Sequence, residues 1–216
     1  MAASGVSFQL SFAREITRVT AQIQTTPEQL KKAGDRARRK TMRWLSTRMA
    51  REISQSLKVP QKGLKSRWST TTAGKGDSEV AILWFGTVPL AAENAGRPRQ
   101  SRRGTTVASR RFDGAFFRGV YDDTPRVWIR KSRAAALGLK LPAMSRKQGG
   151  GNSRFLDLGG VNDSSNRGRF PVMRVGIALE DTAAEVFRRY ERRALARFAE
   201  LIEQEINYAV NHERKR

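Results

Sequence analysis

Cysteine is absent from this sequence of 216 residues, and histidine occurs once, at His212. Without cysteine, the chain has no disulfides, no thiolate metal ligands and no cysteine nucleophile. A zinc site is also disfavoured, because such sites use several cysteine, histidine or carboxylate ligands and only one histidine is present. We therefore expect neither a metal ion nor a cofactor.

Long hydrophobic runs are missing as well. The longest run without a polar residue is "VAILWF", residues 80–85, which is far shorter than a span across a bilayer. The N-terminus also lacks the apolar block of a signal peptide. These absences predict a chain that is made in the cytoplasm and does not enter a membrane.

Acidic residues are few compared with basic ones. The sequence has 42 Lys and Arg against 20 Asp and Glu, a formal net charge of +22. Residues 26–75 carry 14 basic side chains against 3 acidic ones, and residues 76–170 carry 17 against 8, whereas residues 171–216 are nearly neutral with 9 against 8. This asymmetry suggests a basic body that meets a polyanion and a neutral C-terminal part that meets protein.

Two long helices are predicted. The first begins at Pro27, because Thr26, Pro27 and Gln29 have the pattern of an N-cap, a first-turn proline and a capping-box partner. The second has a capping-box pattern at Thr182 and Glu185 and keeps helical apolar spacing nearly to the end of the chain. Its large apolar residues are the candidates for a subunit interface: Phe187, Tyr190, Phe198, Leu201 and Ile202.

The remaining segments predict strands. Apolar residues alternate over residues 6–12, and residues 64–73 with 79–87 have the composition of a hairpin. Residues 112–121 and 127–131 flank the turn sequence "DDTP", which predicts a second hairpin. The segment "FPVMRVGIAL" supplies one more strand. We therefore expect a single α+β domain over residues 1–216, in which a mostly antiparallel twisted sheet of about five or six strands packs against two long amphipathic helices. A glycine-rich flexible loop is expected at about residues 134–169.

Arginines are dense in and beside a segment at residues 95–104, which is expected to be a basic loop. Such clusters bind polyanions effectively because phosphate contacts release counterions. A basic face on the first long helix is the second candidate surface. The candidate nucleic-acid-facing residues are Arg97, Arg99, Arg102, Arg103, Arg110 and Arg111 in the first group, and Arg38, Arg39, Lys40 and Arg43 in the second. The neighbouring aromatics Phe112, Phe116, Phe117, Tyr121 and Trp128 could stack on bases, but an inward-facing core role on the hairpin is the favoured interpretation.

Catalytic patterns are weak. Phosphoryl-transfer chemistry needs clustered carboxylates for a metal ion or a histidine base within reach. Asp122 and Asp123 lie where a turn uses aspartate for its own backbone, Asp157 stands alone, and His212 lies in a tail that is expected to fray. The stretch "GKGDS" lacks the spacing of a phosphate-binding loop. We therefore expect a protein that is not an enzyme.

Several motifs occur in an order that resembles a known family. They are "WLSTRMAREISQSLKVPQKGLKSRW", a "VPL" after a strand, "FDGAFFRGV" leading to "VWIR", and "FPVMRVGIAL" ahead of the terminal helix. Together they resemble the bacteriophage minor tail protein Z family, the tail completion proteins of long-tailed phages and prophages, over roughly residues 27–210. The glycine-rich segment at residues 148–168 looks longer than the family pattern.

The resemblance implies a structural virion protein without enzymatic activity, at the head-proximal end of a phage tail, which finishes the tail so that the genome can pass. It implies a homo-oligomeric ring, expected to be a hexamer, with tail or neck proteins such as the tail terminator and the tail tube as partners. Contact with genomic DNA would be non-specific and through phosphate. The alternative function is a stand-alone basic protein that binds RNA or DNA, which the same charge would suit.

Overall fold

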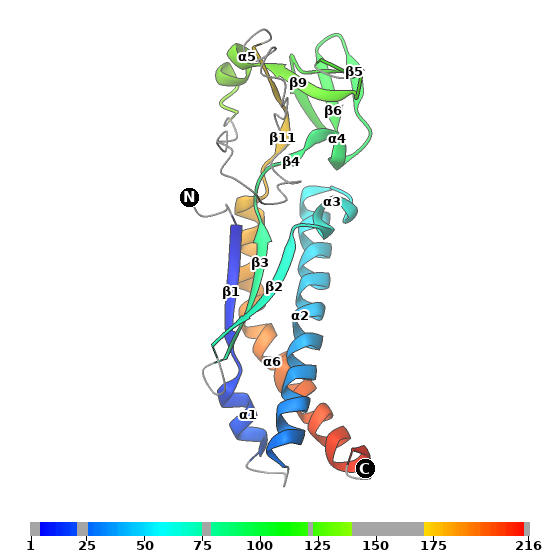
Figure 1. Ribbon diagram of the computed structural model, residues 1–216. Helices are drawn as coiled ribbons and strands as arrows, with labels where there is room; N and C mark the ends of the chain where they lie inside the picture. Colours follow the sequence, from blue (N-terminus) through cyan, green and yellow to red (C-terminus); the bar gives the residue numbers. More distant parts are fainter. Residues whose placement is uncertain (1–4, 21–25, 75–78, 121–122, 140–170, 214–216) are drawn as a thin grey trace. The chain divides into compact units, whose positions relative to one another are not determined.

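The computed structural model describes residues 5–20, 26–74, 79–120, 123–139 and 171–213, and its ribbon is shown in Figure 1. The chain divides into two compact units. Unit 1 comprises Met1–Ser56, Lys65–Gly86 and Asp181–Arg216, and unit 2 comprises Leu57–Leu64 and Thr87–Glu180. The expectation of one domain over residues 1–216 stays a prediction.

Helix α2 of unit 1 spans Pro27–Leu57, the segment for which the sequence predicts a helix. Its predicted capping box is confirmed: Gln29 N donates to Thr26 Oγ1 over 3.3 Å, and Thr26 N donates to Gln29 Oε1 over 3.2 Å. These bonds satisfy donors that the first helical turn leaves free. The helix ends where Lys58 adopts a left-handed conformation, with φ of 53°.

Helix α6 spans Glu180–His212 and therefore begins two residues before the predicted cap. The capping box predicted at Thr182 is wrong, because Thr182 lies inside the first turn. Glu180 and Asp181 occupy the N-terminal end instead, where negative charge is favourable next to the positive end of the helix dipole. A shorter helix, α1, spans Ala13–Thr20.

The sheet of unit 1 has three antiparallel strands in the order β1-β3-β2. They span Gly5–Ser11 (β1), Trp68–Ala73 (β2) and Val80–Gly86 (β3), so the strand at the N-terminus and the hairpin are both confirmed. Residues directly opposite share a face, and Phe8 lies opposite Leu83. Both are buried on the face that packs on α6, where the ring of Phe8 lies 4.7 Å from that of Phe187.

Unit 2 consists of short elements. Its strands are β4 (Leu90–Ala91), β5 (Arg99–Ser101), β6 (Gly104–Val107), β7 (Arg110–Asp113), β8 (Phe116–Arg118), β9 (Arg126–Arg130), β10 (Val172–Arg174) and β11 (Gly176–Ile177). Its helices are α3 (Lys62–Lys65), α4 (Ala92–Ala95) and α5 (Lys131–Ala136). The strands pair in three antiparallel sheets, in the orders β5-β6-β7, β10-β9-β8 and β11-β4.

The α+β class is thus confirmed, but the described strands belong to four small sheets rather than to one sheet of five or six strands. The segment predicted as one last strand shows why. It divides at Val175 into β10, which pairs with β9, and β11, which pairs with β4. At the division, Val175 N donates to Val127 O, and Val175 O accepts from Ala92 N, each over 2.9 Å.

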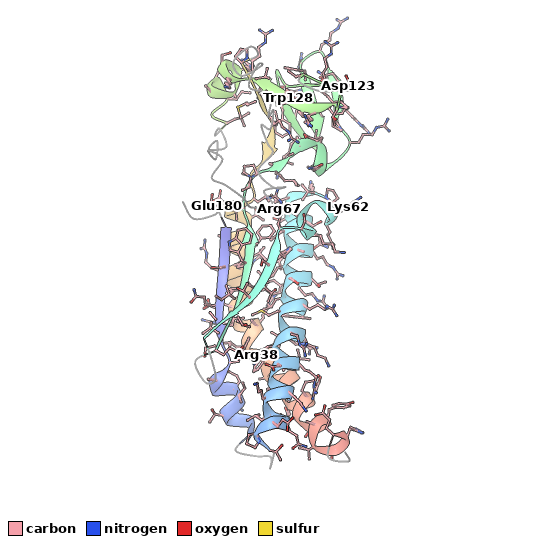
Figure 2. The ribbon with its side chains drawn as sticks, viewed as in Figure 1. Arg38, Lys62, Arg67, Asp123, Trp128 and Glu180 are labelled. Carbon is pink, nitrogen blue, oxygen red and sulfur yellow. The ribbon has the colours of Figure 1, made fainter. Side chains whose placement is uncertain are left out.

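The hairpin predicted around "DDTP" is present as β8 and β9, which pair antiparallel. Its first strand is shorter than the predicted residues 112–121, because Phe112 and Asp113 belong to β7 of another sheet. Trp128 is buried, and its indole N–H donates to Arg118 O over 3.0 Å, so a core role is confirmed for this aromatic residue (Figure 2). Phe112, Phe116 and Phe117 are only half-buried. Tyr121 and most of the loop predicted at residues 134–169 lie outside the described residues.

The five side chains predicted to form a subunit interface are all buried within unit 1 itself: Phe187, Tyr190, Phe198, Leu201 and Ile202. The ring of Phe198 stacks on that of Phe12 at 3.9 Å, and Tyr190 lies 6.0 Å from Trp44. A side chain already buried in its own chain offers no surface to a neighbour. These residues form core, and the interface assigned to them is corrected accordingly.

Candidate nucleic-acid interface

The arginine-rich segment is a three-stranded antiparallel meander made by β5, β6 and β7, rather than a loop. We call these three strands with their two turns and the adjoining Arg97 the arginine meander. Arg102 and Arg103 form the two-residue turn between β5 and β6, since Ser101 pairs directly with Gly104. A turn this tight places both arginines at the tip of a hairpin.

The register decides which arginines share a surface. Arg99 lies opposite Thr106, and Thr106 lies opposite Arg111, so all three project from one face of the meander. On the other face, Thr105 and Val107 are buried. Arg110 lies opposite Val107, which places it on this second face, and it is half-buried. Five of the six predicted residues are exposed: Arg97, Arg99, Arg102, Arg103 and Arg111.

One acidic side chain belongs to the meander. Asp113 forms an ion pair with Arg111, in which Arg111 Nε lies 2.7 Å from Asp113 Oδ1. Both side chains are about half exposed, at 52% and 41%, although Asp113 Oδ1 itself is buried, so water screens the pair only in part. In Figure 2, long nitrogen-tipped side chains extend outward from the strands of this part of the chain. The exposed charge of the meander is therefore strongly positive.

Sequence reasoning missed Gln100, which fixes the meander to the next hairpin. Its Oε1 accepts a hydrogen bond from Thr105 Oγ1 and another from Phe117 N, each over 2.8 Å. Its Nε2 donates to Ser101 O over 3.0 Å. A single amide thus joins β5 to β6 and β8. Nothing in the local pattern "RPRQSRRG" distinguishes this glutamine from a solvated one.

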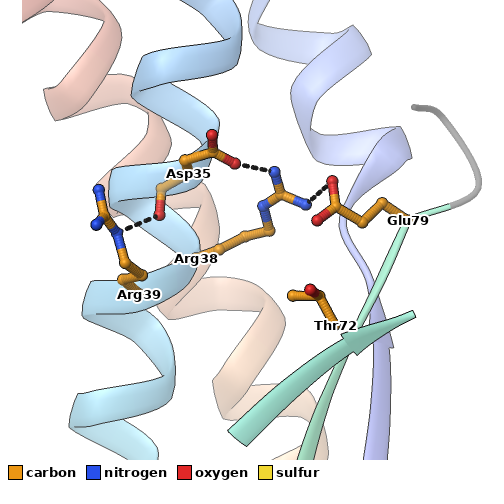
Figure 3. Close-up of a pocket in the computed structure, with 5 residues that line it drawn as sticks. All are labelled: Asp35, Arg38, Arg39, Thr72 and Glu79. Atoms are coloured by element: carbon orange, nitrogen blue, oxygen red, sulfur yellow. Dashed lines mark hydrogen bonds and ion pairs between the residues drawn. The ribbon is translucent and has the colours of Figure 1, made fainter. Parts of the chain in front are cut away.

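The second predicted group, on α2, is differently placed. Arg38 lies between the carboxylates of Asp35 and Glu79, and only 12% of its side chain is exposed (Figure 3). Lys40 forms an ion pair with Glu205 of α6. Arg39 and Arg43 are exposed, although Arg39 Nε donates to the backbone oxygen of Asp35 over 3.3 Å. Two of the four residues in this group are therefore in ion pairs with carboxylates of the same chain.

A hollow of about 310 Å³ lies beside Arg38 and is lined by Asp35, Arg38, Arg39, Thr72 and Glu79. Thr72 of β2 and the α2 residues face each other across it in Figure 3. Its two arginines are matched by two carboxylates, so the hollow has no net attraction for an anion. We assign it no ligand.

The acid that neutralises Lys40 is also bound by Arg36. Arg36 Nε lies 2.6 Å from Glu205 Oε2, and Arg36 Nη1 lies 2.6 Å from Glu213 Oε1. Burial alone would raise the pKa of Glu205, but hydrogen bonds and attraction from Lys40 and Arg36 outweigh it and lower that pKa below the ordinary value of 4.5. Glu205 is therefore a buried carboxylate that two cations of α2 keep ionised.

Of the candidate catalytic acids, only Asp123 lies in the part of the chain that the structure describes. Asp123 is exposed, while Asp122 and Asp157 lie outside the described residues. His212 is exposed at the end of α6, with its ring 5.1 Å from that of Tyr208. Within the described ranges, no three histidine or carboxylate side chains are grouped so that they could hold a metal ion. Among the described helices, none is long and apolar enough to cross a membrane.

Comparison with known proteins adds no assignment: the chain matches no protein-family model, no curated protein and no solved structure at the significance required.

Proposed function

We propose that the chain is a structural virion protein at the head-proximal end of a phage tail, a tail completion or neck ring component that helps to finish the tail and lets the genome pass. Two independent arguments support this proposal. The order of motifs resembles the minor tail protein Z family, and the chain carries an exposed surface suited to nucleic acid. The proposed role is structural and requires no catalytic group.

The exposed arginines of the meander are the single observation on which the nucleic-acid part rests. Arg99, Arg111 and the turn residues Arg102 and Arg103 are exposed, with Asp113 as their acidic neighbour. Guanidinium groups bind phosphate oxygens with paired N–H donors, and such contacts carry no direct sequence information. The surface is therefore suited to a duplex that must be held loosely and moved along.

The proposed assembly is a closed cyclic ring of identical subunits, expected to be a hexamer, that contacts tail or neck proteins such as the tail terminator and the tail tube. Heterologous contacts generate a ring when the rotation between subunits closes. The buried apolar residues of α6 are not available for that contact. Another surface must provide it.

The test is the molar mass of the purified chain by light scattering, at low and high salt, with and without duplex DNA. The proposal predicts a salt-resistant oligomer, a hexamer in particular, whose association with DNA weakens as salt rises. A chain that stays monomeric at every salt concentration and forms only salt-sensitive complexes with RNA or DNA would support the stand-alone binding protein instead. A chain that binds no nucleic acid at low salt would contradict both functions.

A further inference from the structure

The sheet β1-β3-β2 contains no charged residue. Its strands read "GVSFQLS", "VAILWFG" and "WSTTTA". This contrasts with a chain of which 29% is charged and whose net charge is +22. The absence is not explained by burial, because Ser69–Ala73 of β2 are all exposed, as are Gly5, Ser7, Gln9 and Ser11 of β1.

Among the described residues, neither edge of this sheet has a partner strand, although Thr72 of the edge strand β2 also lines the hollow beside Arg38 and Arg39 of α2. Within the described part of the chain, β1 and β2 each pair with β3 alone, so each presents a second row of backbone donors and acceptors. Proteins usually protect such edges with lysine, proline or a bulge, because an unprotected edge pairs with another strand. The three strands contain neither lysine nor proline.

The face of the sheet turned away from α6 is also uncharged. Its central row is formed by Val80, Ile82 and Trp84, which are half-buried, and it is flanked by the exposed serine, threonine and glutamine side chains of the two edge strands. The indole of Trp84 covers Gly5 and Gly86, and a Cβ atom at either glycine would collide with it. Depletion of charge around a central tryptophan is the composition found in the cores of protein interfaces.

We propose that this sheet is the self-association surface of the protein, and that β1 of one copy adds to the free edge of β2 in the next copy. Two copies of a chain with a charge of +22 repel each other over most of their surfaces. The uncharged sheet is where their backbones approach at the lowest electrostatic cost. The two edges also match in length, with seven residues in β1 and six in β2.

Pairing of unlike edges leaves a free β1 and a free β2 at the ends of every assembly. Such a heterologous contact continues until it closes into a ring. Both β1 and β2 run antiparallel to β3, so they run in the same direction as each other. In a ring whose axis is parallel to the strands, β1 of one copy would therefore pair in parallel with β2 of the next copy. The ring geometry rests on the proposed function, whereas the self-association rests on the sheet alone.

Disulfide trapping tests the contact directly, because the chain has no cysteine of its own. Gln9 and Thr71 lie on the same face, on either side of Ile82. Within one chain, two strand spacings separate them by roughly 9.5 Å, which exceeds the Cα separation of about 7 Å that a disulfide tolerates. Any disulfide in the double variant Gln9→Cys/Thr71→Cys must therefore join two chains.

Under mild oxidation, the double variant should give a covalent ladder that extends beyond the dimer, while each single variant gives no ladder. Combining Thr71→Cys with Ser7→Cys or with Ser11→Cys tests the two neighbouring registers on the same face. Dimers formed by Thr71→Cys alone would indicate that β2 pairs with β2 across a two-fold axis, and would overturn the proposal.

Charge on the edges provides the second readout. Gln9→Lys or Thr71→Lys should abolish the oligomer in light scattering, with the thermal unfolding of the subunit preserved. Gln204→Lys, which adds the same charge at an exposed position of α6, is the matched control and should leave the oligomer intact.

A wild-type chain that stays monomeric, or an oligomer that survives both lysine substitutions without a ladder in any of the three registers, would overturn the inference. These failures are distinguishable from failure of the proposed function. An oligomer that binds DNA, survives both lysine substitutions and gives no ladder would remove the sheet contact alone, because the ring would then be held by another surface. A ladder together with no DNA binding would leave the sheet contact standing and contradict the proposed function.

Discussion

The basic face of α2 and the arginine meander have a similar density of charge in the sequence, but the structure uses them differently. On α2, Arg38 is bound by Asp35 and Glu79, and Lys40 is bound by Glu205. In the meander, five arginines are exposed, and its one acid, Asp113, forms an ion pair with Arg111. Much of the positive charge of α2 is therefore held in ion pairs within unit 1, whereas the arginines of the meander are exposed and can bind an external anion.

The difference lies in acids that are far away in the sequence. Glu205 is 165 residues from Lys40, and a window of sequence around α2 contains no sign of it. Counting charges along the chain therefore overestimates the free charge of a helix that packs against another helix. Among the described residues, the ion pair of the meander is instead with Asp113, a neighbour in the sequence.

The largest expected effect tests whether α6 is core. Phe198 is fully buried against Phe12, so Phe198→Ala should lower the free energy of unfolding by about 3–5 kcal/mol. Tyr208→Ala, at a ring that is 52% exposed and contacts Arg36, should cost less than about 1 kcal/mol. Urea denaturation of both variants measures this. If Phe198→Ala dissociated an oligomer without destabilising the subunit, the original interface assignment would be right.

The second largest expected effect tests whether Glu205 of α6 neutralises basic side chains of α2. Glu205→Gln removes the carboxylate bound by Arg36 and Lys40 and should cost about 1.5–3 kcal/mol at neutral pH. Because the folded pKa of Glu205 is lowered, its stabilisation is complete above the ordinary value of 4.5 and is lost as the pH falls through the folded pKa.

The stability difference between wild type and Glu205→Gln should therefore shrink in acid. Urea unfolding at pH 7 and at a pH well below 4.5 measures it. An equal difference at both pH values would show that folding does not lower the pKa of this carboxyl, and the contrast between the two basic regions would fail on the α2 side.

The smallest expected effect on stability concerns the turn between β6 and β7 of the meander. The turn between β6 and β7 places Ala108 and Ser109 at φ of 50° and 63°, a conformation that glycine and asparagine adopt more easily. Ala108→Gly should raise stability by about 1 kcal/mol. Ala135→Gly in helix α5 is the control and should have the opposite sign, at about 0.5–1 kcal/mol. Thermal unfolding compares them, and destabilisation by Ala108→Gly would contradict the turn geometry.

The sequence predicted the features that local interactions decide. The capping box at Thr26, the hairpin of β2 and β3, and the antiparallel pairing of β8 with β9 each depend on residues close together in the chain. It did not predict how the strands divide into sheets. For example, the paired strands β11 and β4 are separated by roughly 80 residues of sequence or more. Strands of two residues also carry too little alternation of apolar and polar residues to indicate a partner.

For the candidate site, composition located the arginine cluster, but not its geometry. Separating Arg110 from Arg111 needs the strand register, because adjacent residues face opposite sides. The amphipathic pattern of α6 likewise predicts an apolar stripe without telling whether it packs on its own chain or on a neighbour. Here Phe8 and Phe12 of the same chain cover it.

The most direct test of the central claim is the salt dependence of duplex DNA binding, measured by fluorescence anisotropy for two variants of equal net charge. One replaces the exposed meander arginines Arg97, Arg99, Arg102, Arg103 and Arg111 by glutamine, and the other replaces the exposed α2 residues Lys31, Arg39, Arg43, Arg48 and Arg51. The meander variant should lose about 0.9 of the log–log slope for each arginine that contacts phosphate, while the α2 variant keeps a slope close to that of the wild type. Equal losses in both variants would show that net charge alone drives binding, and a larger loss in the α2 variant would place the DNA on the helix.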